Sequence, residues 1–432
     1  MAEVHVVIDD CTTVSASDVR AVRTRDTGNG RANWRFNPDR IAVGLKDRLD
    51  DRQMDWLEIH SAIFAADRAA GRDAGLDWNR SIELHVPVRD PDHWKPFTAA
   101  FEDIFASLTY DHLGLHFYAG QGFADPPRQR QQPFPDSDCI ALLSGGMDSF
   151  VGALELLDTG AKPLFLAASG SGATNGAQTD VFEVISRIDS TRELLKLIAR
   201  RANKDFPGDE QSQRSRSFLF VSTAALVAAA SGFQDVYVNE NGIMAVHVPL
   251  TAARSGSFST RTATPRVLDQ MARLATDALG APITVKNRLL GMTKGDVAKR
   301  ADELGQAAAV KQTISCWSIS HTRTHCGYCA PCILRRVACL QHAIVDVDYD
   351  VDVLTDSAAL DKDEAKDTLV HFIQLAQEFR DGDDFDLELD HADLINGASG
   401  LGINQTIALY RRWADEILTT FDKHPVPRTL MS

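Results

Sequence analysis

The sequence predicts an α/β protein with a doubly wound, mainly parallel β-sheet at its centre, an α+β region before it and a helical region after it. From residue 137 onward, short apolar runs alternate with longer segments of helical periodicity, which is the pattern of βαβ units. The residues before about 136 contain strands and helices without that regular alternation, and the residues after about 345 turn acidic and then helical. We therefore divide the chain into residues 1–135, 136–345 and 346–432.

The composition is that of a globular protein with room for two or three domains. Its 432 residues are 44% hydrophobic and 24% charged, with a formal net charge of −15. Such an acidic chain is poorly suited to broad contact with a nucleic-acid backbone, which needs a basic face. Residues 1–5 show no basic leader, and the most apolar window, 218–230, is too short to span a bilayer. We expect a cytoplasmic protein without a nucleic-acid or membrane partner.

The first region, residues 1–135, shows elements but no chemical signature. The predicted strands are residues 5–8, 82–88 and 113–118, and residues 94–108 are a predicted helix. Residues 56–66 fit either a strand or a helix, and we favour the helix. Residues 125–135 are rich in proline and glutamine and are typical of a linker. No metal spacing and no nucleotide loop occur here, so the sequence does not indicate a role for this region.

The central region, residues 136–345, supplies the elements of the predicted parallel sheet. Its strands are expected at residues 139–143, 162–167, 235–239 and 282–286, and its helices at 150–157, 181–202, 217–230, 266–279 and 294–304. Residues 169–176, rich in glycine and serine, are expected to form a flexible loop after the second strand. Ligands of open α/β sheets bind at the carboxyl ends of the strands, so this edge is the expected site.

The first strand of this region leads into a glycine turn and then a helix. Such a turn gathers free backbone N–H groups at a helix N-terminus, where they suit a phosphate or pyrophosphate. Gly145 and Gly146 allow close approach, Ser144 and Ser149 add hydroxyl donors, and Asp148 suits a metal ion or the orientation of the loop. The alternative is an ordinary polar turn with a helix cap. The predicted nucleotide-binding residues are Leu143, Ser144, Gly145, Gly146, Met147, Asp148 and Ser149.

Four of the seven cysteines fall within one short segment. Cys316 precedes Cys326, Cys329 and Cys332, and four thiolates at this spacing can close a tetrahedral structural Zn²⁺ site. An iron–sulfur cluster remains the alternative, because Cys-x-x-Cys-x-x-Cys also occurs in ferredoxin-type sites. His321 and His325 lie in the connecting loop and could replace one cysteine.

The last region, residues 346–432, begins with acidic residues at 346, 348, 350 and 352, followed by helical segments around 364–379 and 405–421. We interpret the acidic run as a solvated edge strand or loop. The helices are interpreted as a cap or an interface.

Together, the glycine turn and the cysteine cluster resemble QueC, the 7-cyano-7-deazaguanine synthase family, whose turn is the PP-loop of the N-type ATP pyrophosphatases. The resemblance extends from about residue 140 to 336 and is strongest at residues 143–149 and 315–335. Residues 216–220 and 293–294 match the family more weakly. It implies an adenine nucleotide alpha-hydrolase-like fold and adenylation of 7-carboxy-7-deazaguanine by ATP, with loss of pyrophosphate. Mg²⁺ would neutralise the leaving group, and Zn²⁺ would order the loops near the base.

The sequence also departs from the family. Residues 169–174 replace its Tyr-Gly-Gln-Arg-His-like motif, residues 254–262 replace its Gly-Tyr-Pro-Asp-Cys-Arg stretch, and both flanking regions are extra. These features resemble the QueC-like subgroup of bacterial anti-phage operons, such as QatC of the Qat system. That resemblance implies an amide product, or conjugation to a protein amine, and partner subunits encoded in a defence operon.

The adenylation that the resemblance implies needs a cation to stabilise the pentacoordinate phosphorus. The predicted catalytic residues are Asp148, Ser149, Arg216, Arg261 and Lys294. Each of the three cations could equally be an ordinary surface residue. Two other functions remain open, namely a PP-loop tRNA-modifying enzyme and a non-catalytic nucleotide-binding subunit of a defence complex.

Overall fold

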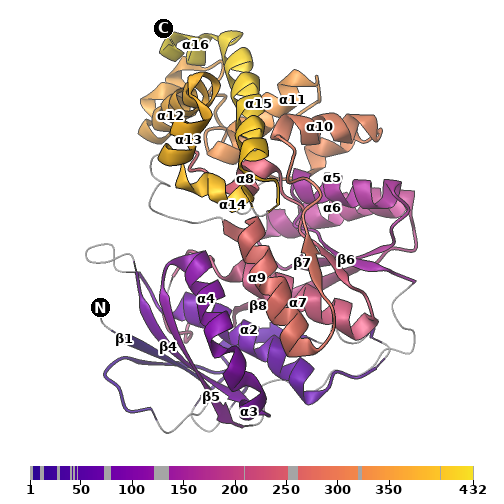
Figure 1. The fold of residues 1–432 in the computed structure, drawn as a ribbon, viewed down its shortest axis with the longest axis vertical. Helices are drawn as coiled ribbons and strands as arrows, with labels where there is room; N and C mark the ends of the chain where they lie inside the picture. The colour runs from indigo at the N-terminus through magenta and orange to yellow at the C-terminus, as the bar shows by residue number, and fades with distance from the viewer. Residues whose placement is uncertain are drawn as a thin grey trace.

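The computed structural model contains two β-sheets and a C-terminal group of helices (Figure 1). It describes residues 3–9, 14–26, 30–38, 41, 44–45, 47–72, 79–120, 136–208, 210–251, 261–319, 324–398 and 400–431. The predicted linker at 125–135, most of the 254–262 segment and His321 lie outside the described residues. Among the described residues, no helix has the length and apolar character needed to cross a membrane.

The N-terminal sheet is parallel throughout. Its strand order is β2 (Val19–Val22), β1 (Glu3–Ile8), β4 (Ser81–Val88) and β5 (His112–Ala119). The sequence predicted an α+β arrangement here, and the pairing corrects it to the α/β type. The reason is the connections: α2 (Asp51–Ala69) lies between β1 and β4, and α3 (Pro91–Trp94) and α4 (Thr98–Thr109) lie between β4 and β5. A crossover of this kind returns the chain in the same direction.

The central sheet has six strands in the order β10 (Thr284–Lys286), β9 (Asp235–Tyr237), β6 (Cys139–Leu142), β7 (Pro163–Ala168), β8 (Leu194–Arg201) and β3 (Trp34–Asn37). Five strands are parallel, and β3 pairs with β8 in the antiparallel direction. The predicted doubly wound sheet is confirmed. Strand β3 is an addition that comes from the N-terminal region, so the predicted division near residue 135 does not separate the two sheets.

Helices cover both faces of the central sheet. On one side lie α5 (Met147–Asp158) and α6 (Gly172–Ile188), with α10 (Lys294–Glu303) against α5. On the other side lie α7 (Arg216–Ser231) and α9 (Pro265–Leu279), which pack in turn against α2 and α4 (Figure 1). One continuous set of buried apolar side chains therefore runs from the N-terminal sheet to the central sheet, with Leu84, Phe101, Phe218 and Val236 among its members.

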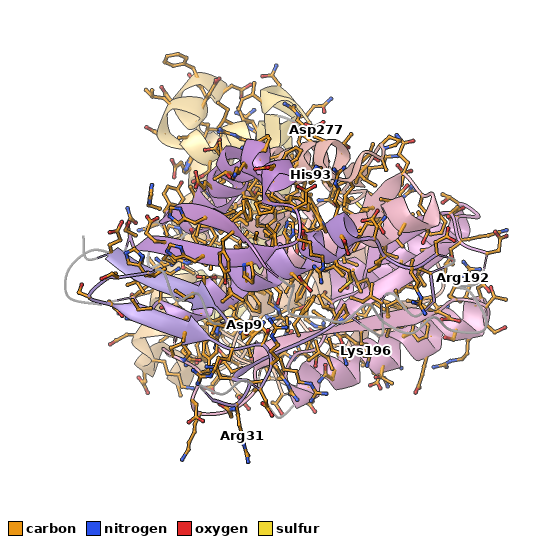
Figure 2. The ribbon with its side chains drawn as sticks, turned by 90° about the horizontal axis from the view of Figure 1, so that it is seen from below. Asp9, Arg31, His93, Arg192, Lys196 and Asp277 are labelled. Atoms are coloured by element: carbon orange, nitrogen blue, oxygen red, sulfur yellow. The ribbon has the colours of Figure 1, made fainter. Side chains whose placement is uncertain are left out.

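Polar contacts also join the two sheets. The Nε1–H of Trp56 donates to the Ser222 carbonyl over 2.8 Å, within the buried interface. Near the surface, His93 Nε2 lies 3.3 Å from the Ala278 carbonyl, and Figure 2 shows His93 close to Asp277 of α9. The N-terminal sheet and the central sheet thus form one packed body.

Two elements differ from the sequence prediction. Residues 181–202 were expected to be one helix, but α6 ends at Ile188 and residues 194–201 form β8. The expected loop at 169–176 is shorter, because α6 begins at Gly172 with the Ser171 hydroxyl accepting from the Thr174 N–H over 3.2 Å. The glycine-rich segment is therefore largely the first turn of a helix.

The C-terminal region is helical, as predicted. It contains the helices η5 (Ser357–Asp361), α12 (Asp363–Asp381), α13 (Asp384–Asp390), η6 (Ala392–Leu394), α14 (Ile395–Ala398), α15 (Ile403–Asp422) and α16 (Pro425–Met431). They share a second core with α8 (Gly242–Val246) and α11 (Ala330–Gln341). The acidic run before them is a loop, but it is not wholly solvated: Asp346 is buried and accepts from Arg335 Nε over 2.7 Å.

Candidate nucleotide-binding site and cysteine cluster

The predicted glycine turn lies between the end of β6 and the start of α5, at the carboxyl edge of the central sheet. Gly145 has φ +85°, a backbone conformation that other residues rarely adopt. A Cβ at this position would also lie only 3.0 Å from the Gln178 backbone nitrogen, so both the conformation and the close contact favour glycine. The Ser149 hydroxyl lies 3.1 Å from the Gly146 carbonyl, to which it donates. The backbone N–H of Ser144 donates to the same hydroxyl over 3.2 Å. These bonds hold the turn open around its backbone N–H groups.

Asp148 is at the centre of a buried charged cluster beneath this turn. Lys294 Nζ lies 2.8 Å from both Asp148 carboxylate oxygens, and only 8% and 7% of the two side chains are exposed. Asn241 Nδ2 donates to Asp148 over 3.0 Å and lies 3.3 Å from Glu240 Oε1. Four side chains from three elements thus converge: α5, the loop after β9, and the start of α10.

The two carboxyl groups of this cluster have opposite pKa shifts. Burial opposes ionisation of Asp148, but the Lys294 charge and the hydrogen bonds from Glu240, Lys294 and Asn241 outweigh it and hold its pKa below the ordinary value. Burial, followed by the Asp148 charge, raises the pKa of Glu240 well above its ordinary value. The environment therefore favours ionisation of Asp148 over ionisation of Glu240. Two carboxyl groups beside the glycine turn are also suitable oxygen ligands for Mg²⁺.

Two cavities adjoin the turn. The smaller, of about 160 Å³, is lined by Ser144, Gly146, Asp148, Glu240 and Lys294 among others. The larger, of about 440 Å³, extends over the ends of β6, β7 and β9 and has a mainly apolar wall. Its lining includes Leu142, Leu166, Ala168, Gln178, Arg216, Phe220 and Val238. The arrangement offers a small polar compartment for phosphates next to a larger apolar compartment that suits a base and a sugar.

The three predicted catalytic cations lie in different places. Lys294 lines the smaller cavity and Arg216 lines the larger one. Arg261 lines neither, because its guanidinium donates to Asp393 over 3.1 Å and lies 4.7 Å from the centre of the Tyr110 ring. The structure thus brings Lys294 and Arg216 to the turn, whereas Arg261 joins the N-terminal and C-terminal regions.

The four cysteines form a compact cluster at the start of α11. Their sulfur atoms all lie within 4.8 Å of one another, and all four side chains are buried. The Cys329 and Cys326 sulfurs lie 3.4 and 3.9 Å from that of Cys332. With Zn–S bonds of about 2.3 Å, a tetrahedral site needs sulfur–sulfur distances of about 3.8 Å. The backbone N–H of Cys326 donates to Cys316 over 3.4 Å, as a thiolate requires. The cluster fits zinc.

His325 is not placed as a ligand of this cluster. Its Nε2 accepts the Ser315 N–H over 2.9 Å, and its backbone N–H donates to the Asp348 carbonyl over 3.2 Å. The acidic loop is thereby tied to the segment that carries Cys316.

The cysteine cluster and the glycine turn are directly connected. Ile314, two residues before Cys316, donates its N–H to the Gly145 carbonyl over 3.0 Å and forms a bridge with Gly146. Arg335, fully buried on α11, donates to the Thr313 carbonyl and hydroxyl over 3.2 and 2.7 Å. A metal held by the cysteines therefore stabilises one wall of the smaller cavity.

Sequence reasoning missed Glu240 and left Asn241 undecided between a turn and a ligand contact. Asn241 in fact caps α8, its side chain accepting from the Met244 N–H over 3.2 Å while it also donates to Asp148. The signal that could have found both is their position directly after a buried strand, where parallel sheets place their ligand-binding residues.

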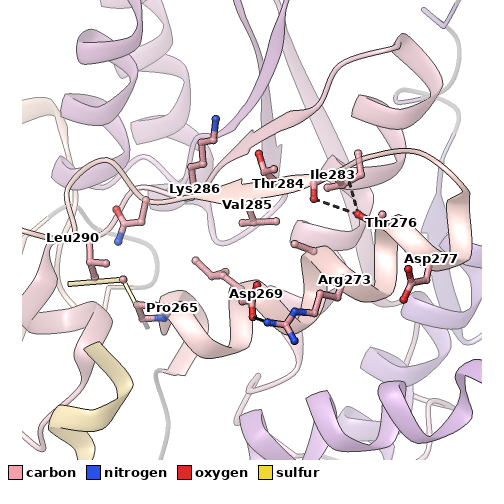
Figure 3. A pocket seen from close by; sticks show the side chains of 14 residues that line it. Pro265, Asp269, Arg273, Thr276, Asp277, Ile283, Thr284, Val285, Lys286 and Leu290 are labelled. Carbon is pink, nitrogen blue, oxygen red and sulfur yellow. Dashed lines mark hydrogen bonds and ion pairs between the residues drawn. The ribbon is translucent and has the colours of Figure 1, made fainter. Parts of the chain in front are cut away.

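A third cavity, of about 940 Å³, is larger than these two but lies away from the turn. Figure 3 shows its lining on α9 and β10, where Arg273 pairs with Asp269 over 2.5 Å and Thr276 accepts the Ile283 N–H over 3.0 Å. Its residues include none from the glycine turn. The cavities at the turn therefore remain the candidate nucleotide site.

Comparison with known proteins gives matches to the central region. Residues 200–343 match the model of the family described as "Queuosine biosynthesis protein QueC", a range that begins after the glycine turn and contains all four cysteines. A 7-cyano-7-deazaguanine synthase of Syntrophobacter fumaroxidans is 29% identical over 153 residues, which are 33% of this chain and 61% of that protein. The 7-cyano-7-deazaguanine synthases of Rickettsia felis and Rickettsia prowazekii are 29% and 30% identical over 132 and 137 residues, each 31% of this chain and 54% of the relative.

The chain thus spans 54% to 61% of the length of these curated relatives. A solved structure, "Adenylation, ketoreductase, and pseudo Asub multidomain structure of a keto acid-selecting NRPS module", is 10% identical over 72% of this chain and 37% of that chain. Its TM-score of 0.23 is too low to indicate a shared fold. The family and sequence matches support a QueC-like domain in this chain.

Proposed function

We propose that this protein is an ATP-dependent PP-loop enzyme that adenylates the carboxylate of a 7-carboxy-7-deazaguanine-type base. The observation that carries the proposal is the joining of the glycine turn, through Ile314, to a four-cysteine cluster that lies within the QueC family match. The turn suits the phosphates of a nucleotide, and the family suggests the substrate. The proposed function includes ATP and Mg²⁺ as cofactors and Zn²⁺ as a structural metal.

In the proposed reaction a carboxylate oxygen of the base attacks the α-phosphorus of ATP. A bond forms between that oxygen and phosphorus, the bond to the bridging oxygen of the β-phosphate breaks, and pyrophosphate leaves with its electron pair. The backbone N–H groups around Gly145 and Gly146 hold the leaving pyrophosphate. Asp148 and Glu240 would hold Mg²⁺, which neutralises the developing charge.

The cations at the turn complete this assignment. Lys294 neutralises Asp148 and lines the smaller cavity, where its ammonium group would also be available to the phosphates if Asp148 held Mg²⁺. Arg216, on the wall of the larger cavity, is the second candidate to stabilise charge on the α-phosphate. Arg261 remains a predicted catalytic residue, but its contacts favour a positioning role between regions.

The acyl adenylate is the branch point of the proposal. Attack by ammonia on the acyl carbon expels AMP and gives an amide, which a second adenylation by ATP and a second loss of AMP can convert to the nitrile. Attack by a protein amine expels AMP in the same way and gives a conjugate. The extra N-terminal and C-terminal regions favour an acceptor other than ammonia alone. We include in the proposal the role in anti-phage defence that the QatC-like features imply, with a protein acceptor or partner subunits from the same operon.

Pyrophosphate release tests the proposed function. Wild-type protein with ATP, Mg²⁺ and 7-carboxy-7-deazaguanine should release pyrophosphate in proportion to the base added. Ser149→Ala should lower the rate about 100-fold or more, because the hydroxyl bonds that shape the turn around the phosphates would be lost. Ser186→Ala, a serine on α6 outside the cavities, is the matched control. Full turnover by Ser149→Ala would remove the PP-loop assignment, and release that needs tRNA instead of the base would favour a tRNA-modifying enzyme.

A further inference from the structure

A cavity of about 560 Å³ lies beside the nucleotide cavities and is lined by residues from three regions of the chain. The N-terminal region contributes Trp34, Phe64 and Arg68, and the segment before the cysteine cluster contributes Ile314 and Trp317. The central sheet contributes the end of β8 and the starts of α6 and α7. We call it the arginine cavity.

The arginine cavity opens toward the site of the proposed chemistry. It shares Thr174, Gln213, Arg216 and Phe220 with the larger nucleotide cavity. With the smaller one it shares Ile314 and Trp317. A molecule in the arginine cavity can therefore reach the junction of the two compartments, where the α-phosphate of a bound nucleotide would lie.

The charge of the arginine cavity is the reverse of that of the whole chain. Four arginines line it, Arg68, Arg200, Arg201 and Arg216, and no aspartate or glutamate is among the described residues of its lining. The chain as a whole carries a formal charge of −15. Burial, and then the positive charge of Arg68, lowers the pKa of Arg216. Cations that approach one another in a partly buried cavity are stabilised by a bound anion.

Aromatic rings form the other part of the wall. Phe64 and Trp34 are almost fully buried, and Trp34 is fixed because its Nε1–H donates to the Ser61 hydroxyl over 3.0 Å. Phe220 and Trp317 are half-buried and face the same cavity. Arginines together with aromatic rings favour a planar ring system that carries a negative charge.

We propose that the arginine cavity binds the carboxylate substrate, a planar heteroaromatic acid, and that the N-terminal region is part of this substrate site. The proposal rests on the adenylation function proposed above. Arg68, Trp34 and Phe64 lie before residue 200, outside the QueC family match. Substrate selection in this chain therefore depends on side chains that the matched domain does not supply.

The test varies the charge of the ligand and of the cavity together. Arg68→Gln and Arg201→Gln remove one positive charge each, and Arg68→Lys retains it. Arg35→Gln is the matched control, because Arg35 follows Trp34 on β3 but is exposed and outside the lining. The ligands are 7-carboxy-7-deazaguanine and the neutral nitrile 7-cyano-7-deazaguanine, which share one ring.

Each neutralising variant should raise the KM for the acid about 10- to 100-fold, the range for loss of a charge-assisted hydrogen bond. The KM for ATP should stay within about twofold, and calorimetric binding of the nitrile should weaken far less than that of the acid. Arg68→Lys should recover most of the affinity, and Arg35→Gln should match wild type. Arg68 also donates to the Gln211 carbonyl over 3.3 Å, so its replacement could change the local structure. The Arg201 variant removes a positive charge from the same cavity without breaking that hydrogen bond.

Two outcomes overturn the inference, and they can be told apart. If pyrophosphate release requires the acid but neither neutralising variant changes its KM, the acid binds elsewhere and only the inference fails. If wild-type protein releases no pyrophosphate with the acid, the proposed function fails and the inference fails with it.

Discussion

Removal of the Lys294 ammonium group should destabilise the protein more than removal of that group together with the Asp148 charge. Lys294→Met leaves the buried Asp148 carboxylate beside Glu240 without a cation. Breaking a buried ion pair from one side costs about 3–5 kcal/mol, because the remaining charge is uncompensated. The double variant Asp148→Asn with Lys294→Met should recover most of this loss, since no unpaired charge remains.

The size of the effect can be expressed as a melting temperature. An unfolding entropy of about 2.1 cal/mol/K per residue over 432 residues gives about 0.9 kcal/mol per kelvin. Lys294→Met should therefore lower Tm by about 3–6 °C. Calorimetry without ATP or Mg²⁺ measures this directly, because ligands that bind the variants differently would shift Tm themselves. Lys299→Met is the control: it lies on the same helix, 60% exposed, and its ion pair with Glu303 spans one helical turn at the surface.

The pH dependence of Tm provides a second, independent test of the same prediction. In the wild type the depressed pKa of Asp148 stabilises the fold above the ordinary carboxyl pKa, and this stability is lost as the pH falls through the folded value. Without Lys294, burial raises the pKa of Asp148, so the variant loses stability as the pH rises. The difference in Tm between wild type and Lys294→Met should therefore widen from pH 5 to pH 8. The reasoning would be refuted if Lys294→Met melted within about 1 °C of Lys299→Met at both pH 5 and pH 8.

Three further changes test other parts of the site. Cys329→Ser should lose bound zinc and melt lower, because structural zinc contributes folding energy, whereas Cys339→Ser, equally buried but outside the cluster, should keep one zinc per chain by metal analysis. Glu240→Gln should melt close to the wild type, since burial and the Asp148 charge disfavour an ionised carboxylate there and a neutral amide replaces it, yet need about tenfold more Mg²⁺ or above for half-maximal pyrophosphate release; an unchanged Mg²⁺ requirement would exclude Glu240 as a ligand. Burial raises the pKa of Glu416 from 4.5 to about 7, so the wild type should lose stability as the pH rises across that interval, and Glu416→Gln should not; parallel stability curves would contradict this.

The parts of the site that sequence could predict are those whose geometry is set within a few residues. The glycine turn depends on contacts between Ser144, Gly146 and Ser149, which are at most five positions apart. Three of the four cysteines are similarly close, and Gly327 between them has φ +87°, as a knuckle around a metal requires. In both cases the contacts join residues a few positions apart, so motif and spacing were sufficient to predict the local geometry.

Strand β8 shows why other parts could not be predicted. Its sequence, Leu-Leu-Lys-Leu-Ile-Ala-Arg-Arg, contains several good helix formers, and it follows a helix without a strong break. It becomes a strand because β7 pairs with one edge and β3 with the other, Trp34 opposite Arg201 and Asn37 opposite Ile198. Those partners are tertiary, and β3 lies more than 150 positions earlier in the chain. Local propensity therefore had no access to the interaction that decided the structure.

The position of Arg216 links the N-terminal region to the chemistry. Asp67, buried on α2, accepts from the Ser215 backbone N–H and hydroxyl over 3.1 and 2.8 Å, immediately before Arg216 begins α7. Arg80 holds Asp67 in turn, with its Nη2 2.6 Å from the carboxylate. The start of α7, and with it the guanidinium at the nucleotide cavity, is thus set by the N-terminal region. A QueC-like domain cut at residue 135 would therefore lose the carboxylate that holds the residue before Arg216, one of the predicted catalytic cations.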